Sequence, residues 1–381
     1  MGLAADAGQL HEVAFFAYPP GLHWLGEGHM GIRVVQWATG AMGKTCLRAI
    51  LDHPDLELVG LYVYSDGKVG RDAGEIARRE PVGIAATDQI EEILALDADV
   101  VVHAPRLQPP YAHHNADIQR LLASGKNVIS INGHTRPGHW GAEYTKAFED
   151  ACKAGNSTLL GAGLNPGFVS ERLAAVATGL CNRIDHVHVT ESVDARELRS
   201  SDYVFKILGF GTELGTIDPN DPSWAPAEML NGLYSEVVAD FVDRMGLILD
   251  RIETDHVMLP ATRDIETAAG LIPKGTVGHT NWCWHGLVDG ARFFTMSIHW
   301  VMENTHLGGP DHPLWRVEIS GQPGVDIAVN LKRADGDPFK TSPEQWGVAA
   351  SVVNAIPDVC AAPAGLMAPR MASPFRARFG S

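Results

Sequence analysis

Hydrophobic residues in the first half of the chain form short, β-branched runs that alternate with helix-like stretches. The runs have the length of buried strands, and the stretches between them repeat apolar residues at helical spacing. Predicted strands are Ile32–Trp37, Glu57–Tyr64, Gly83–Ala86, Asp99–His103, Asn127–Ile131 and Thr158–Gly161, and predicted helices are Met42–Asp52, Gln89–Leu96, His113–Ser124 and Ala142–Ala154. This alternation predicts a doubly wound parallel sheet covered by helices on both faces.

The pattern changes after Gly167, where longer strands dominate. Helices are predicted at Val169–Leu180 and Pro226–Met245, and strands at Ile184–Val193, Arg251–Leu259, Gly275–Leu287, Arg292–Glu303, Leu314–Ser320 and Val325–Lys332. Successive strands joined by turns such as Asp289-Gly290 are typical of an open, mostly antiparallel sheet. A last helix, Pro343–Ala355, is predicted to return to the first domain.

The predicted fold class is therefore α/β, a Rossmann sheet followed by an α+β domain. We expect a nucleotide-binding domain over 31–166, a substrate and dimerisation domain over 167–340, and a returning helix and tail over 341–381. Residues 1–30 have no basic region and contain Pro19-Pro20, so they do not resemble a secretory signal. We expect either a loosely ordered leader or a functional start at Met30.

Charge and cysteine content narrow the class of protein. The 46 acidic and 30 basic residues leave a net charge of −16, which disfavours binding to nucleic acid or to anionic membranes. The five cysteines are widely spaced, as in a reduced cytoplasmic protein. No apolar run reaches the roughly 18 residues of a membrane span. The spacing of the 17 histidines does not suggest a metal site.

A glycine turn follows the first predicted strand, in the stretch VVQWATGAMGKT. Gly40 and Gly43 fit the second and third glycines of the G-x-G-x-x-G fingerprint, whereas Ala38 stands at the first. The second glycine lets the backbone approach a pyrophosphate, and the third lets helix and strand pack closely. The turn predicts dinucleotide binding, with a purely structural turn as the alternative.

The end of the second predicted strand bears on the choice of coenzyme. Sites that prefer NAD usually carry Asp or Glu there, which accepts a hydrogen bond from the ribose 2′-OH. Here Ser65 can donate to a 2′-phosphate, and Lys68 or Arg71 can neutralise it. We predict NADP(H) as the preferred coenzyme. NAD(H) is the alternative, which Asp66 favours, and solvated loop charges would explain the same residues without a ligand.

Several stretches together resemble one family of oxidoreductases, which joins a dihydrodipicolinate-reductase-type domain to a 2,4-diaminopentanoate-dehydrogenase-like domain and includes native amine dehydrogenases. The matching stretches are VVQWATGAMG, LELVGLYVYSDGKVGRDAGE, DADVVVHAP, LLASGKNVIS, GAGLNPGF and VVNAIP. They extend from Arg33 to Pro357. The resemblance implies interconversion of an amine with a carbonyl compound and ammonia, and a homodimer built through the second sheet.

The resemblance also implies which residues contact the coenzyme. Thr39, Gly40, Ala41, Met42 and Gly43 would hold the pyrophosphate, His103, Ala104 and Pro105 would line the nicotinamide ribose, Asn165 and Pro166 would lie beside the nicotinamide, and Asn354 would approach from the returning helix. We add Asn132, which follows the strand ending NVIS. Asn165 is also a candidate catalytic residue.

One departure from the family concerns the catalytic group. Amine-forming relatives carry a Thr-Cys-Glu-Glu type sequence after this strand, and its glutamate is thought to handle protons and the ammonia nitrogen. This chain has Ile131-Asn132-Gly133-His134 instead. Either neutral His134 replaces the glutamate, or a carboxylate such as Glu143 or Glu303 enters the site. Alternatively His134 donates a proton to a carbonyl oxygen, and the product is an alcohol.

The predicted strand Arg292–Glu303 offers a second set of polar candidates. Its alternation places Thr295, Ser297, His299 and Glu303 on one face, which suits either a cleft or the wet side of a sheet. The function predicted from the sequence is NAD(P)H-dependent reductive amination of a small ketone or aldehyde, with the amine as the reverse substrate. A carbonyl reductase and a non-catalytic NADP-binding sensor are the alternatives.

Overall fold

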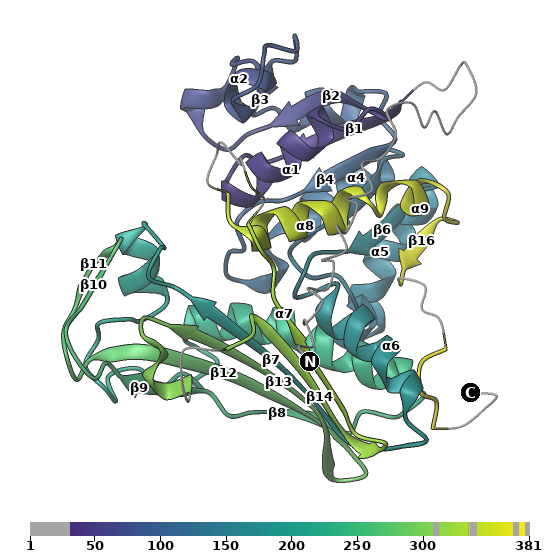
Figure 1. Ribbon diagram of the computed structural model, residues 1–381. Helices are drawn as coiled ribbons and strands as arrows, with labels where there is room; N and C mark the ends of the chain where they lie inside the picture. Colours follow the sequence, from purple (N-terminus) through teal and green to yellow (C-terminus); the bar gives the residue numbers. More distant parts are fainter. Residues whose placement is uncertain (1–30, 308–311, 334, 336–340, 369–372, 378–381) are drawn as a thin grey trace, which may run out of the picture.

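The computed structural model describes residues 31–307, 312–333, 335, 341–368 and 373–377, arranged as two packed units (Figure 1). The expected leader over 1–30 lies outside the described residues. The first unit is a parallel sheet between helices, and the second is a large sheet with helices on the face toward the first unit. The predicted fold class is confirmed.

The first sheet has seven strands in the order β16-β6-β5-β4-β1-β2-β3, and every neighbouring pair is parallel. The strands are β1 (Ile32–Trp37), β2 (Leu56–Tyr62), β3 (Ala86–Thr87), β4 (Val100–His103), β5 (Asn127–Ser130), β6 (Thr158–Gly161) and β16 (Gly365–Met367). The strand order reverses between β1 and β4. In sheets of this kind ligands bind at such a switch point, outside the carboxyl ends of the strands.

Two hydrophobic clusters cover the two faces of this sheet. Helices α1 (Ala41–Leu51), α2 (Ala73–Ala77), α8 (Pro343–Val353) and α9 (Ile356–Cys360) pack on one face, and α3 (Ile90–Ala95), α4 (Asn115–Ala123) and α5 (Ala142–Gly155) on the other. Adjacent strand residues such as Val34 and Val35 belong to opposite clusters, because successive side chains of a strand point to opposite faces. This explains the unbroken apolar runs in the sequence.

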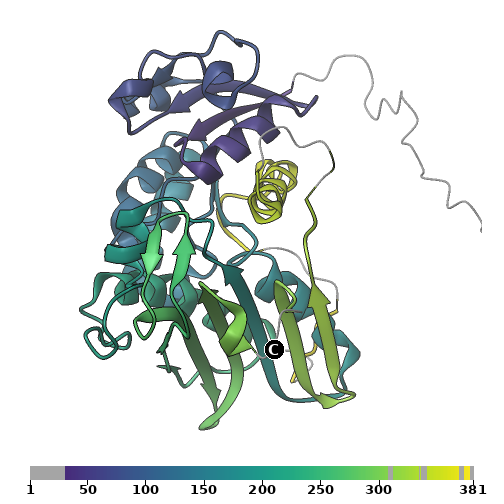
Figure 2. The same ribbon diagram turned by 60° about the vertical axis from the view of Figure 1, so that its left-hand side comes forward.

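The C-terminal part of the chain completes the first unit, as Figure 2 shows from the side. Helix α8 packs along α1, and Ser342 caps its start through a capping box with Gln345. Strand β16 then pairs with β6. The sequence did not predict β16, because three residues are too short to show a strand pattern.

The second sheet has the order β15-β14-β7-β13-β12-β8, with β9 also paired to β12. Its strands are β7 (Arg183–Asp194), β8 (Arg251–Thr254), β9 (Val257–Pro260), β12 (Val277–Val288), β13 (Ala291–Val301), β14 (Trp315–Gln322) and β15 (Val325–Val329). Only β7 and β13 run parallel among these pairs. A separate hairpin, β10 (Ile265–Thr267) with β11 (Gly270–Ile272), was not predicted.

Two predicted elements of this unit are wrong in detail. The single strand Arg251–Leu259 is broken into β8 and β9, because Nδ1 of His256 accepts the backbone N–H of Cys283 at 2.9 Å in place of a ladder bond. The predicted helix Val169–Leu180 is a π-type turn, η4 (Val169–Ala174), followed by short α6 (Ala175–Ala177) and a 3₁₀ turn. Apolar periodicity does not distinguish these helix types.

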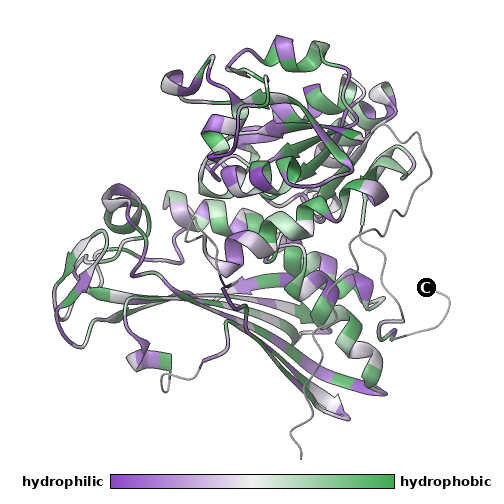
Figure 3. Ribbon diagram, turned by 45° about the horizontal axis from the view of Figure 1, so that its top comes forward, coloured by the Kyte–Doolittle hydropathy of each residue, from purple (hydrophilic) through white to green (hydrophobic). Residues whose placement is uncertain are grey.

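Helix α7 (Ala225–Arg244) packs its apolar stripe on the second sheet, with Met229, Leu233, Val237 and Phe241 buried. Phe241 stacks on Phe294 of β13 with ring centroids 4.2 Å apart. Each buried ring contributes roughly 2–3 kcal/mol of hydrophobic stabilisation. Figure 3 shows hydrophobic residues along the strands and hydrophilic ones on many outer turns. Helices long and apolar enough to cross a membrane are absent from the described ranges.

Candidate functional site

The turn after β1 has the geometry of a dinucleotide-binding turn. Ala38 adopts a φ of 74°, the left-handed conformation that the first glycine usually supplies. A Cβ on Gly43 would overlap the carbonyl oxygen of Ala38, so only glycine lets α1 approach the strand this closely. A Cβ on Gly40 would meet nothing within 4 Å, which leaves the start of α1 open to an anionic group.

These two glycines predict separable effects. Gly40→Ala should preserve the free energy of unfolding, because φ is −65° there, but should weaken coenzyme binding through the added methyl group. Gly43→Ala should lower the free energy of unfolding by about 2 kcal/mol through overpacking. Urea unfolding and coenzyme titration of both variants test this. Equal destabilisation by both would contradict the assignment of the two positions.

Positive charge surrounds this turn. Nζ of Lys68 donates to the backbone oxygen of Thr39 at 3.0 Å and to its Oγ1 at 2.9 Å. Partial burial, followed by the charge of Arg71, lowers the pKa of Lys68. The pKa of Lys44 is lowered by burial, followed by the charge of Lys68. Ser65, Asp66 and Arg71 are exposed beside them. The residues fit a phosphate group, which would relieve the repulsion among these cations.

The strands next to the turn end in buried polar residues. His103 closes β4 and is fully buried, and neither ring nitrogen has a hydrogen-bond partner among the described residues. Ala104 and Pro105 follow it and are also buried. The Asn132 side chain donates to the backbone oxygen of Pro105 at 3.0 Å, which joins the ends of β4 and β5. An unpaired buried imidazole is costly, and the predicted contact of His103 with the coenzyme stays a prediction.

His134 is turned into the first unit. Its Nε2 donates to Oδ1 of Asn115 on α4 at 3.1 Å, and its ring packs against Tyr111 and Phe148. Burial, with the charge of nearby His114, lowers the pKa of His134 to about 4. The imidazole is therefore neutral near pH 7, and the protonated nitrogen is engaged within the protein.

A buried carboxylate of α7 holds the loop that follows His134. Glu236 is fully buried and accepts the backbone N–H of Arg136 at 3.0 Å and the indole N–H of Trp140 at 2.7 Å. The loop of the first unit is therefore anchored to the second. The sequence reasoning missed Glu236, because its partners are about a hundred residues away along the chain.

Asn165 meets a second carboxyl group that the sequence reasoning missed. Asn165 follows β6 at the same edge of the sheet, next to buried Pro166. Its Nδ2 donates to Oε2 of Glu191 on β7, and Oη of Tyr234 on α7 donates to its backbone oxygen at 3.4 Å. A signal was present in the sequence, because Glu191 continues the buried alternation of Val187 and Val189.

Two predicted residues lie in other surroundings. Glu303 follows β13, accepts the backbone N–H and the hydroxyl of Thr262, and pairs with Arg263 at 3.4 Å. Burial acts to raise the pKa of Glu303, but the hydrogen bonds from Thr262 and Thr305, and then the charge of Arg263, lower it overall. Asn354 is the exposed C-cap of α8, at the opposite end of that helix from Glu344. The predicted contacts of both residues with substrate or coenzyme stay predictions.

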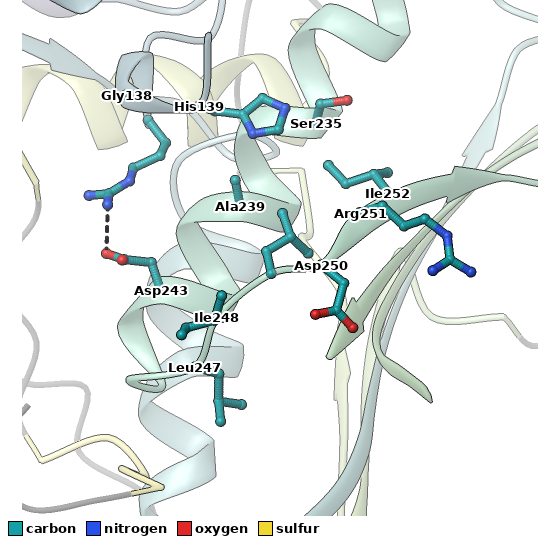
Figure 4. Close-up of a pocket in the computed structure, with 12 residues that line it drawn as sticks. Gly138, His139, Ser235, Ala239, Asp243, Leu247, Ile248, Asp250, Arg251 and Ile252 are labelled. Carbon is teal, nitrogen blue, oxygen red and sulfur yellow. Dashed lines mark ion pairs between the residues drawn. The ribbon is translucent and has the colours of Figure 1, made fainter. Parts of the chain in front are cut away.

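A cavity of about 610 Å³ lies elsewhere, between the loop after Arg136, helix α7 and the segment 247–252 (Figure 4). An ion pair between Arg136 and Asp243, 3.0 Å long, crosses one side of it. None of the residues predicted from the sequence lines this cavity. Among the described residues, three or more His, Cys, Asp or Glu side chains do not converge in a way that could hold a metal ion.

Comparisons with known proteins agree with this arrangement. Residues 30–129 match the family described as dihydrodipicolinate reductase, N-terminus. An amine dehydrogenase of Streptomyces virginiae is 28% identical over 311 residues, which cover 78% of this chain and 84% of that protein. A 4-hydroxy-tetrahydrodipicolinate reductase of Myxococcus xanthus is 39% identical over 104 residues, which cover 27% of this chain and 37% of the reductase.

A solved structure extends the similarity to both units. The amine dehydrogenase from Mycobacterium smegmatis matches with a TM-score of 0.73 and 21% sequence identity, covering 92% of this chain and 100% of that chain. At this identity the structural match shows the fold alone. With the sequence relatives, it confirms the resemblance inferred from the quoted stretches.

Proposed function

Because this chain carries a dihydrodipicolinate-reductase-type coenzyme domain and is an NAD(P)-dependent oxidoreductase, we propose that it is an NADP(H)-dependent amine dehydrogenase. The reaction is reductive amination of a small ketone or aldehyde with ammonia, and the reverse oxidises the amine. Similarity to the Streptomyces virginiae amine dehydrogenase over 84% of that protein supports this reaction class.

The coenzyme in this proposal occupies the edge where β1, β4, β5 and β6 end. Thr39–Gly43 bind the pyrophosphate, Ser65, Lys68 and Arg71 bind the 2′-phosphate, and His103–Pro105, Asn132, Asn165 and Pro166 lie along the nicotinamide half. When bound, the coenzyme supplies a hydride to the carbon that becomes the amine carbon. The cations around Lys68 are the reason for preferring NADP(H).

The environment of His134 argues against the alternative in which this residue gives a proton to the carbonyl oxygen. Alcohol formation on this scaffold needs an acid near the carbonyl oxygen. His134 is neutral near pH 7, and its Nε2 is bonded to Asn115, so it does not provide that acid. If His134→Ala abolished turnover while the protein stayed folded and bound NADPH, His134 would return as the proton donor.

The test is NADPH consumption by the purified full chain with a panel of small aldehydes and ketones, with and without excess ammonium. Consumption that requires ammonium, with an amine as product, is the expected result. Consumption that ignores ammonium, with an alcohol as product, would identify a carbonyl reductase instead. NADPH binding without any turnover would identify a sensor.

We also propose a homodimer formed by the second sheet, in the cytoplasm, where the five unpaired cysteines stay reduced. Helices α6 and α7 lie on one face of this sheet (Figure 1). The opposite face carries polar pairs such as His186 with Thr295 and His188 with Ser297, each 2.8 Å apart. Polar side chains that bond along the face of a sheet suit a self-complementary contact.

This assembly makes a separate prediction. Light scattering should give a particle of about twice the 41.0 kDa chain mass. Thr190→Arg, which adds a charge beside His188 on that face, should give a folded monomer. Dimers of unchanged stability in this variant would rule out this face as the contact.

A further inference from the structure

Glu191 is an acidic residue on an otherwise apolar surface. It lies on β7 in the same alternation as Val187 and Val189, and its cross-strand neighbours are Ile298 on β13 and Trp315 on β14. Both neighbours belong to the hydrophobic core between this sheet and α7. A carboxyl group here loses solvation without contributing to packing, so it calls for a functional reason.

The contact with Asn165 connects this carboxyl group to the coenzyme edge. Asn165 lies four residues after the end of β6, and its Nδ2 donates to Oε2 of Glu191. Oδ1 of Asn165 is buried and has no hydrogen-bond partner in the described part of the chain, so it can accept a hydrogen bond from a ligand. The Tyr234 hydroxyl holds the Asn165 backbone from the other side. The chain therefore places one carboxyl oxygen beside the strand edge where the coenzyme binds.

Glu191 also differs from the other buried carboxyl groups. Both oxygens of Glu236 are bonded to the loop after His134, and those of Glu303 are bonded to Thr262. Glu171 is 1% exposed, which seals it from any substrate. Glu191 remains half-buried, and ion pairs to it are absent from the described part of the chain. It is thus held by a neutral partner and remains accessible.

We infer that Glu191 is the acid–base residue of the reaction, with Asn165 as the residue that positions it; this inference rests on the proposed amination. Ammonia addition to a carbonyl needs a group that moves a proton from nitrogen to oxygen, and loss of water needs an acid. A carboxylate left after that step also stabilises the iminium ion by its charge. Glu191 performs all three tasks from one position.

The proposed reaction adds ammonia, loses water and then accepts a hydride. The ammonia nitrogen bonds to the carbonyl carbon, while protonated Glu191 gives its proton to the carbonyl oxygen and takes one from the nitrogen. Glu191 then protonates the resulting hydroxyl group, the C–O bond breaks, and water leaves an iminium ion opposite the Glu191 carboxylate. Hydride transfer to the iminium carbon gives the neutral amine, and Glu191 regains a proton from solvent.

The surroundings of Glu191 suit both protonation states. Desolvation raises its pKa to about 7, and the nearby charge of Glu344 acts in the same direction, while the side chains of Asn165 and Trp315 oppose the shift. The titratable groups that face it are Tyr234 on α7 and Glu344 in the first turn of α8. A group that titrates near neutrality can donate and accept protons in one cycle.

The experiment compares the full-length wild type with Glu191→Gln and Glu191→Asp. Glu191→Gln keeps the shape and the partner of the side chain but cannot exchange protons. We expect kcat for ammonium-dependent NADPH oxidation to fall at least about 100-fold. NADPH affinity and melting temperature should stay near the wild-type values. Glu191→Asp should recover part of kcat, and an ionisation near neutrality in the wild-type pH profile should vanish in Glu191→Gln.

The outcomes separate this inference from the proposed function. Glu253→Gln on β8, a half-buried carboxylate that pairs with Arg251, is the matched control and should keep full activity. If the wild type aminates and Glu191→Gln keeps a kcat within about threefold of the wild-type value, the inference is overturned and the proposed function stays intact. If NADPH oxidation by the wild type does not need ammonium, both the inference and the proposed function are overturned. Loss of NADPH binding or of folding in Glu191→Gln, with normal kcat in Glu191→Asp, would make the residue structural and overturn the inference.

Discussion

Replacing Lys68 with glutamate is expected to reverse the coenzyme preference. The Lys68 ammonium lies at the glycine turn, where it contacts Thr39, and a 2′-phosphate bound there would gain a charge-assisted hydrogen bond. Loss of this bond, with repulsion by the new carboxylate, should raise the Kd for NADPH by about 100-fold, or roughly 3 kcal/mol. The introduced carboxylate can accept from the 2′-OH of NADH, so NADH should bind as well or better.

Fluorescence titration with both coenzymes measures this change. Lys153→Glu is the matched control, because Lys153 is exposed in the last turn of α5 and its replacement alters the net charge equally. Unchanged NADPH affinity in Lys68→Glu would show that Lys68 only braces the turn. In that case Asp66, exposed beside it, would become the residue that selects the coenzyme.

Replacing Glu171 with glutamine is expected to stabilise the protein at alkaline pH. Glu171 lies in η4, and neither of its carboxyl oxygens has a hydrogen-bond partner among the described residues. Burial, followed by the charge of Asp240, raises its pKa from 4.5 to about 7. The folded state therefore holds a proton that the unfolded state releases between these two values, and stability is lost as pH rises through this window. At pH values above 7 the variant should gain roughly 3 kcal/mol.

Urea unfolding from acidic to alkaline pH tests this prediction. The difference in free energy of unfolding between variant and wild type should be near zero below the pKa of Glu171 in the unfolded state. It should level off above the pKa of Glu171 in the folded state. Comparing the two curves cancels the opposite contribution of the buried histidines, whose lowered pKa values, as at His134, make stability rise with pH. Glu143→Gln, at an exposed position of α5, is the control. If the free energies of unfolding of variant and wild type differed by the same amount at every pH, the effect would come from packing and not from the proton.

The coenzyme half of the candidate site could be predicted from the sequence because its signals are local. Turn residues such as Gly40 and Gly43 lie directly between a strand and a helix. Parallel strands bring all their carboxyl ends to one edge, and the resemblance to the oxidoreductase family implied that His103 and Asn165 contact the coenzyme there. Lys68 was predicted from its position after β2, and the structure brings it onto Thr39.

The substrate half of the candidate site could not be predicted in this way. His134 occupies the chain position expected of a catalytic residue, but its side chain is directed toward Asn115. Glu191 and Asn165 are 26 residues apart in sequence and on different units. Glu191 could have been noticed as a carboxylate in a buried alternation, yet its partner could not have been identified.

The sequence by itself determined the fold class, strands β1, β2, β4, β5 and β6, helices α1, α3, α4 and α5, and the glycine turn, because these depend on periodicity and on residues adjacent in the chain. Only the tertiary structure decided that Glu191 bonds to Asn165, that Glu236 ties the loop after His134 to α7, and that the chain returns to add β16. Side-chain direction and the pairing of distant segments depend on how the units pack. Local sequence does not encode that packing.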